Sequence, residues 1–192
     1  MAFEITNVGK YLKVLDEENR DNLIPAPEDG LQVFNERLNL VQTYNSTLGL
    51  WLDSNIRVMI METALTTNRF CYISGFFTVG ATQYPTVSYP TNSSNENNTQ
   101  GAIIQIGEQI DPARSYVAVA TKGLYYIDYG ESIAVGEYIH PKISGTNADQ
   151  GFAAGSGNST SGRCGTAYEN SGANPNEPTR ILVNIGLTAE TF

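Results

Sequence analysis

The sequence predicts a mainly β protein: an antiparallel β-barrel or β-sandwich with an N-terminal arm or helical segment and long polar loops. Three observations lead to this class. Short runs rich in β-branched and aromatic residues recur from residue 56 onward. Glycine, asparagine, aspartate and proline bound these runs, as they bound strands. Some runs are separated by polar stretches too long for ordinary turns. With 192 residues, the chain fits one compact body with appendages.

Residues 1–55 differ from the rest in composition. Charged residues gather at 16–21, and this acidic cluster lacks the ligand spacing of a calcium-binding loop, so we expect a solvated face. After Asp29-Gly30, apolar residues recur at spacings of three and four: Leu31, Phe34, Leu38, Val41 and Tyr44. This spacing predicts a helical or irregular segment with one apolar stripe. The stripe either packs on the protein's own core or belongs to an arm that docks on a partner.

The β body is expected to comprise residues 56–192. Its predicted strands are 56–61, 70–73, 116–120, 124–127, 133–135, 138–139, 165–169 and 181–187. We expect Gly136 to form a turn with a positive φ. Polar loops are predicted at 81–101, 144–162 and 170–178, because these segments bury too little apolar area to offset the entropy of ordering them. The glycines of 151–157 are expected to form a flexible tract that tolerates alanine.

Charge and composition exclude several kinds of partner. The chain carries 11 basic and 20 acidic residues, a net charge of −9, so nucleic acid and anionic membranes are poor partners. No apolar run is long enough to span a membrane, and no secretory signal is predicted. Charged residues make up only 16% of the chain, which favours a surface solvated by neutral polar groups.

Residues with catalytic potential are few and scattered. His140, the single histidine, precedes Pro141 at a predicted strand end and has no evident partner. Cys71 and Cys164 lack the spacing of a metal or redox motif, so two buried free thiols are expected, and a mutual disulfide remains open. Trp51 is expected to be a buried anchor, with an interface position as the alternative. The sequence predicts no catalytic residue, metal or cofactor, and no enzyme.

Several short motifs of the C-terminal part form a distinctive combination. They are 117–120 with Gly123, the turn and strand at 136–139, the 165–169 segment, and the closing strand 180–185. In this combination, residues 116–187 resemble the small β-rich decoration, or cement, proteins of tailed-bacteriophage capsids. The motifs depend on glycine, which β-barrels use at corners and bulges.

The resemblance implies a structural protein that binds the major capsid protein from outside and stabilises the capsid. It also implies a homotrimer at a symmetry axis of the virion, assembled in the host cytoplasm, with the first thirty residues reaching neighbouring subunits. The candidate capsid contacts in this arm are Phe3, Ile5, Tyr11, Leu12, Leu15, Leu23 and Ile24. The alternative is a virion fibre or adhesin domain whose polar loops bind a host glycan or receptor.

Overall fold

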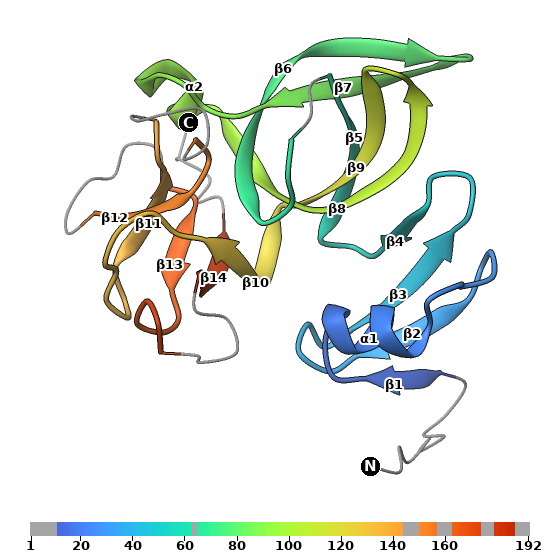
Figure 1. Cartoon of the computed structure of the whole chain (residues 1–192), viewed down its shortest axis with the longest axis horizontal. Coiled ribbons are helices and arrows are strands. Elements are labelled where there is room, and N and C mark those ends of the chain that lie inside the picture. The colour runs from blue at the N-terminus through green and yellow to red at the C-terminus, as the bar shows by residue number, and fades with distance from the viewer. Residues whose placement is uncertain (1–10, 63–64, 144–149, 157–162, 174–178, 187–192) are drawn as a thin grey trace. The chain divides into compact units, whose positions relative to one another are not determined.

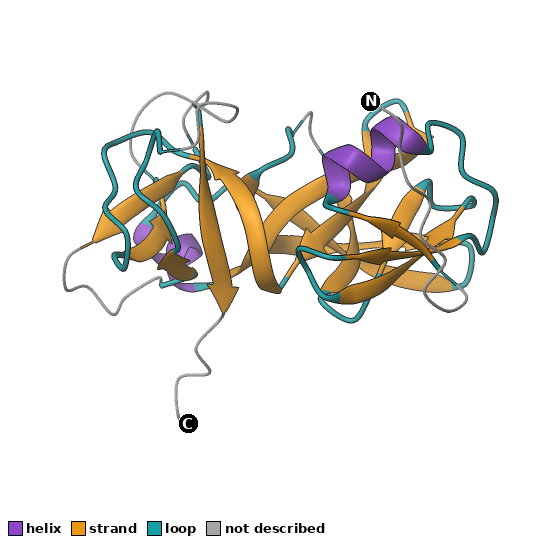
Figure 2. Ribbon diagram, turned by 90° about the horizontal axis from the view of Figure 1, so that it is seen from below, coloured by secondary structure: helices purple, strands orange, loops and turns teal. Residues whose placement is uncertain are grey.

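A computed structural model describes residues 11–62, 65–143, 150–156, 163–173 and 179–186. The protein is mainly β, as the sequence predicts, and the described residues contain only two helices, both short (Figure 2). The chain divides into two compact units, Met1–Ser54 and Asn55–Phe192.

Unit 1 is a four-stranded sheet with one helix (Figure 1). The strand order is β1 (Leu12–Val14), β2 (Gln32–Asn35), β3 (Leu40–Asn45) and β4 (Leu50–Leu52), and α1 spans Glu17–Leu23. β1 runs parallel to β2, whereas β2–β3 and β3–β4 are antiparallel hairpins. The prediction of a helical or irregular segment over 31–52 is therefore wrong, because these residues form β2, β3 and β4.

Two similar turns explain why residues 31–52 form hairpins. In the first turn the Asn35 side chain accepts a hydrogen bond from the Leu38 amide (3.2 Å), and Asn39 has a φ of 54°. In the second, Asn45 accepts from the Leu48 amide (3.0 Å), and Gly49 has a φ of 65°. Asparagine and glycine adopt such left-handed conformations at low cost. Each turn interrupts the alternation of side chains along the strands. The apolar residues before and after a turn are therefore three or four positions apart, as they would be in a helix.

The acidic cluster forms α1, which covers the core of unit 1. Asp16 caps the helix by accepting a hydrogen bond from the Asn19 amide (2.8 Å), and acidic residues occupy the first turn. Arg20 points inward, with its guanidinium carbon 4.8 Å from the centroid of the Trp51 ring. Trp51 is 2% exposed, which confirms the predicted buried anchor. The cluster is therefore not only a solvated face.

Unit 2 begins with a closed five-stranded barrel, visible at the top of Figure 1. Around the barrel the order is β5 (Ile56–Met61), β7 (Thr82–Ser88), β6 (Arg69–Val79), β8 (Thr99–Asp111) and β9 (Arg114–Ala120). β5 and β7 are parallel, and the other pairs are antiparallel. The hydrophobic core of the barrel consists of Met59, Leu65, Cys71, Val87, Ile103, Val117 and Val119.

A five-stranded antiparallel sheet completes unit 2. Its order is β10 (Lys122–Asp128), β14 (Arg180–Gly186), β13 (Gly165–Ala167), β11 (Tyr138–Pro141) and β12 (Ala153–Ser156). The chain enters this sheet directly after β9. A short helix, α2 (Ser93–Asn97), precedes β8. The body is thus a barrel followed by a sheet.

Three predictions about the loops and strands of unit 2 need correction. Residues 81–101 contain β7, α2 and the start of β8, so they are not one polar loop. β7 is ordered because it hydrogen-bonds to a strand on each side and buries Thr86 and Val87. The 144–162 segment contains β12, paired with β11. Residues 133–135 form no strand, although Ile133 is buried and its amide donates to the Ser171 hydroxyl (3.0 Å). Residues 144–149, 157–162 and 174–178 lie outside the described residues.

Gly136 and Gly151 are among the glycines of unit 2 that have positive φ angles. Gly136 has a φ of 84°, which confirms the predicted turn, and a Cβ there would meet no atom within 4 Å. Gly151 has a φ of 79°, and a Cβ there would lie 2.6 Å from the Phe70 carbonyl oxygen. The expectation that Gly151 tolerates alanine is therefore wrong, because its backbone packs against β6.

We expect both Gly136→Val and Gly151→Ala to lower the melting temperature. Backbone strain of this kind costs about 1–3 kcal/mol, and the second variant adds a steric clash with backbone. Circular-dichroism melting of the purified variants measures the effect. Gly186→Ala is the control, because a Cβ at Gly186 would meet no atom within 4 Å. If Gly151→Ala melted like this control, the described packing of Gly151 against β6 would be wrong.

Candidate functional site

The seven candidate contact residues of the arm lie in different environments. Phe3 and Ile5 are outside the described residues, and Tyr11 is half-buried just before β1. Leu12 and Ile24 pack against the core of unit 1, which consists of Val14, Val33 and Trp51. Leu15 and Leu23 are 63% and 39% exposed. Of the described candidates, Leu15 and Leu23 offer the most accessible apolar side chains.

Hydrogen bonds fix the backbone around Leu15 and Leu23 at opposite ends of α1. The Leu15 amide donates to the Asn19 side chain (3.1 Å), and its carbonyl accepts from the Arg37 amide (3.0 Å). Leu23 is the last residue of α1, and the following residue, Ile24, caps the helix through the Arg20 carbonyl (2.9 Å). The two leucines therefore project from an ordered support.

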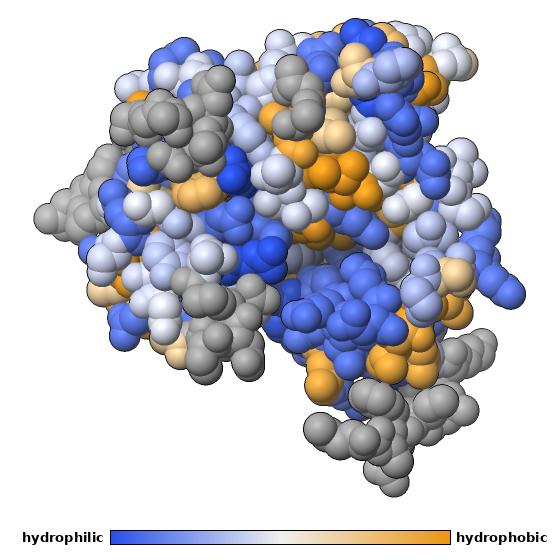
Figure 3. All heavy atoms as spheres, viewed as in Figure 1, coloured by the Kyte–Doolittle hydropathy of each residue, from blue (hydrophilic) through white to orange (hydrophobic). Residues whose placement is uncertain are grey.

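The surroundings of the two leucines are polar. An ion pair joins Lys13 to Glu36 (2.8 Å), and another joins Arg37 to Glu17. Figure 3 shows hydrophilic surface over α1, with smaller hydrophobic areas beside it. Small apolar anchors ringed by polar groups are typical of protein–protein interfaces. We call Leu15 and Leu23 the α1 leucine pair.

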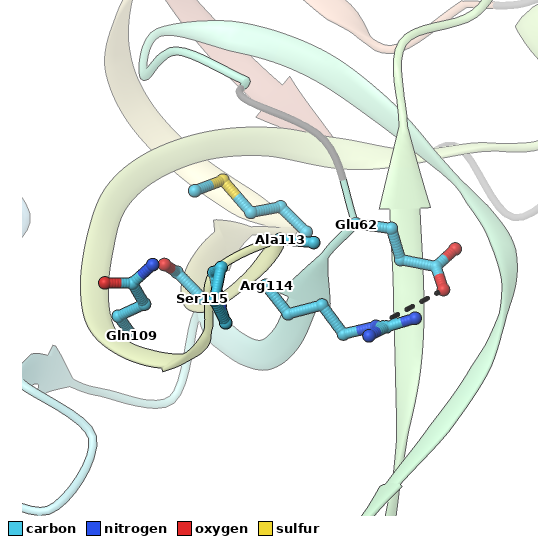
Figure 4. Close-up of a pocket in the computed structure, with 7 residues that line it drawn as sticks. Glu62, Gln109, Ala113, Arg114 and Ser115 are labelled. Carbon is cyan, nitrogen blue, oxygen red and sulfur yellow. Dashed lines mark ion pairs between the residues drawn. The ribbon is translucent and has the colours of Figure 1, made fainter.

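A pocket of about 400 Å³ lies at one end of the barrel (Figure 4). Its lining comes from the end of β5, from β8 and β9 and from the turn between them: Met61, Glu62, Gln109, Pro112, Ala113, Arg114 and Ser115. In Figure 4 the Arg114 side chain points toward Glu62. No sequence pattern predicted this pocket, although Asp111-Pro112 is a turn signal between two strands.

Existing contacts engage the guanidinium of Arg114. Its Nη1 donates to Asp111 Oδ2 (2.9 Å), its Nε lies 3.8 Å from Glu62 Oε1, and it stacks 4.1 Å from the centroid of the Phe77 ring. Hydrogen bonds from the Ala113 amide and from Arg114 lower the pKa of Asp111. The one cation at the pocket thus already faces two carboxylates, so Arg114 is a poor site for an anionic ligand.

His140 has a partner that the sequence did not reveal. Its Nδ1 lies 3.1 Å from Glu96 Oε1, so β11 meets α2, a segment predicted to be loop. Cys164 belongs to the same neighbourhood, because Glu96 acts on it electrostatically. Burial raises the pKa of the Cys164 thiol to about 12, so this cysteine is not a thiolate nucleophile at neutral pH.

A charged cluster joins the barrel to the sheet within unit 2. Asp128 of β10 lies 3.6 Å from Arg69 of β6 and 3.3 Å from Arg180 of β14. The Arg69 guanidinium stacks 4.2 Å from the centroid of the Phe152 ring. Burial raises the pKa of Asp128, and both arginines oppose that shift. These contacts hold two sheets together, which is a structural role.

Two further features concern metal ions and membranes in the described part of the chain. There, no group of three or more histidine, cysteine, aspartate or glutamate side chains is arranged to hold a metal ion. None of the described helices has the length and apolar character needed to cross a membrane. Comparisons of the chain with protein-family models, with curated proteins and with solved structures found no match.

Proposed function

We propose that this chain is a non-enzymatic virion protein that decorates and stabilises the outer surface of a tailed-bacteriophage capsid. The resemblance of residues 116–187 to decoration proteins supports the proposal. The motif segments overlap β9, β10, β11, β13 and β14, which are strands of one unit. The proposed partners are the major capsid protein and further copies of this chain in a trimer.

The α1 leucine pair is the observation that carries the proposal. Leu15 and Leu23 are exposed on a unit that has its own core and is distinct from the β body. Such a unit provides a separate attachment module, with two apolar anchors for a groove on a capsid subunit. In a trimer, three modules would bind together, and multivalency raises avidity without enlarging each contact.

We expect the double substitution Leu15→Ser and Leu23→Ser to abolish most capsid binding. Buried interface anchors contribute about 2 kcal/mol or more each, and about 1.4 kcal/mol corresponds to a tenfold change in affinity. The double variant should therefore bind at least tenfold more weakly in co-sedimentation with undecorated capsids. Its melting temperature should stay unchanged, because both side chains are exposed in the free protein.

The matched control replaces two exposed apolar residues of unit 2, Val135 and Tyr168, by serine. This variant should bind like the unmodified protein. Repeating the assay at about 1 M salt, where the Debye length is about 3 Å, should change occupancy little, because the proposed contact is apolar. Undiminished binding of the leucine variant, or release of the protein at high salt, would contradict this mode of attachment.

A second candidate function rests on Tyr168. Its ring is 62% exposed, and its backbone is fixed because the Tyr168 amide donates to the Leu182 carbonyl (2.8 Å). The Asn170 side chain lies nearby, accepting a hydrogen bond from the Val135 amide (2.9 Å). An exposed ring beside amide groups is a surface on which a sugar stacks, as expected of an adhesin domain. Glycan-array binding that is lost in Tyr168→Ala would favour this alternative.

A further inference from the structure

The fold brings together two cysteines that are far apart in the sequence. Cys71 lies on β6 and belongs to the hydrophobic core of the barrel. Cys164 lies just before β13 in the neighbouring sheet, and its amide donates to the Ile139 carbonyl (2.7 Å). Both side chains are buried, and neither cysteine forms a disulfide in this structure. One cysteine thus belongs to each of the two β-structures of unit 2.

Strand register, a hydrogen bond and electrostatics connect the two cysteines. Across the β6–β8 ladder, Cys71 is opposite Gly101, and the next residue, Tyr72, is opposite Thr99. The Cys164 side chain shares a hydrogen bond with the Thr99 side chain. Cys164 therefore contacts Thr99, which pairs with Tyr72, the residue that follows Cys71. The two thiols also interact electrostatically with each other.

A second connection between the strands lies on the other side of Cys71. The amide of the preceding residue, Phe70, donates to the Gly151 carbonyl (2.7 Å), and the Gly151 amide donates to the Lys142 carbonyl (3.1 Å). Lys142 directly follows β11, the strand next to β13. Hydrogen bonds thus tie β6 to the sheet one residue before Cys71.

We propose that Cys71 and Cys164 are a cross-linking site, which forms one intramolecular disulfide between barrel and sheet when the chain folds with a disulfide oxidant such as oxidised glutathione. One cysteine thiolate attacks the glutathione disulfide and releases one reduced glutathione. The second thiolate then attacks the mixed disulfide and releases another. The protein loses two protons and two electrons, and the oxidant gains them as two glutathione thiols.

Oxidation should depend on whether the chain is already folded. Burial raises the pKa of both thiols, that of Cys164 to about 12. Since the thiolate is the attacking species, the folded protein should react slowly. In the unfolded chain both thiols are solvated and have ordinary reactivity. The redox conditions during folding therefore decide whether the cross-link forms, and a chain folded under reducing conditions keeps its thiols.

Refolding with and without the oxidant tests the proposal. Reduced, denatured protein is refolded either with reduced glutathione alone or with a mixture of reduced and oxidised glutathione. After the second treatment, peptide mapping by mass spectrometry should recover the Cys71–Cys164 cross-link in most monomers. Thiol titration in denaturant should find no free thiol. The melting temperature should rise by several degrees, because the cross-link closes a long loop of the unfolded chain. Folded, reduced protein given the same mixture should oxidise at least tenfold more slowly.

The variants Cys71→Ala and Cys164→Ala serve as controls. Neither should show the rise in melting temperature, and each should acquire at most one glutathione. Should either variant fail to fold, the comparison on the unmodified protein remains decisive. Free thiols, glutathione on a single cysteine, or a disulfide between two chains after oxidative refolding would overturn the proposal. Equally fast oxidation of the folded protein would overturn the dependence on folding.

Discussion

Replacing Gly101 with alanine is expected to prevent the barrel from closing. Gly101 lies on β8 with a φ of 149°, and a Cβ there would lie 2.0 Å from the Ala120 carbonyl oxygen and 2.9 Å from its carbon. These atoms are backbone of β9, the next strand of the barrel, so no side-chain rotation can relieve the clash. Backbone strain and overpacking cost about 1–3 kcal/mol each. Together they reach the lower end of the total stability of a typical domain, about 5–15 kcal/mol.

Soluble yield and circular-dichroism melting measure this effect. Gly101→Ala should be insoluble or should melt at least 10 °C lower than the unmodified protein, since about 1 kcal/mol shifts melting by about 2–4 °C in a protein of this size. The control Gly186→Ala should behave like the unmodified protein, because there is open space around its Cβ position. Equal melting of the two variants would show that β8 and β9 do not approach each other as described.

The substitution Trp51→Ala is expected to unfold unit 1 while unit 2 stays folded. Trp51 is the largest buried side chain of unit 1, with the Tyr44 ring centroid 5.3 Å from its own. Truncating a buried tryptophan costs about 3–5 kcal/mol. The loss also removes the stacking partner of the buried Arg20 guanidinium. A small sheet with one short helix has little stability in reserve.

Amide hydrogen exchange resolves the two units in one experiment. In Trp51→Ala, protection should fall for β2 and β3 and persist for β8 and β9. The matched control Val119→Ala truncates the barrel core and should give the reverse pattern. Loss of protection throughout the chain in both variants would mean that the two units unfold as one. If unit 1 is the attachment module, Trp51→Ala should also lose capsid binding with its barrel intact.

Strand positions in the β body followed directly from local patterns. The run at 116–120 is β9, nearly all of it buried, and the alternating run at 181–187 corresponds to β14. The positive φ of Gly136 was also predictable, because its turn is local. Patterns within a few residues were sufficient for these features, which do not depend on distant partners.

Features that depend on distant partners were missed. β7 is a polar strand, and it is ordered by its ladders with β5 and β6. The local sequence around Gly151 is typical of a flexible tract, but in the structure its backbone packs against β6. In unit 1, by contrast, a local signal was present in the sequence. The pattern Asn-x-x-Leu-Asn/Gly-Leu occurs twice, from Asn35 and from Asn45, and each copy forms a hairpin turn.

The structure was needed to select Leu15 and Leu23 from the seven candidate capsid contacts. Leu12, Leu15, Leu23 and Ile24 are all apolar residues in one charged, proline-containing stretch. Their exposure depends on which faces of β1 and α1 turn toward Trp51, and composition does not determine this. Likewise, the closeness of Cys71 and Cys164 arises from the contact between barrel and sheet. It depends on tertiary structure that no spacing in the sequence encodes.

Electron cryo-microscopy of capsids assembled with and without this protein is the most direct test of the proposed decoration function. We expect added density on the outer capsid surface, arranged as trimers at symmetry axes. Unit 1 should contact the major capsid protein through the α1 leucine pair. A decorated map identical to the undecorated one, or density for this chain only on a tail or fibre, would contradict the proposal.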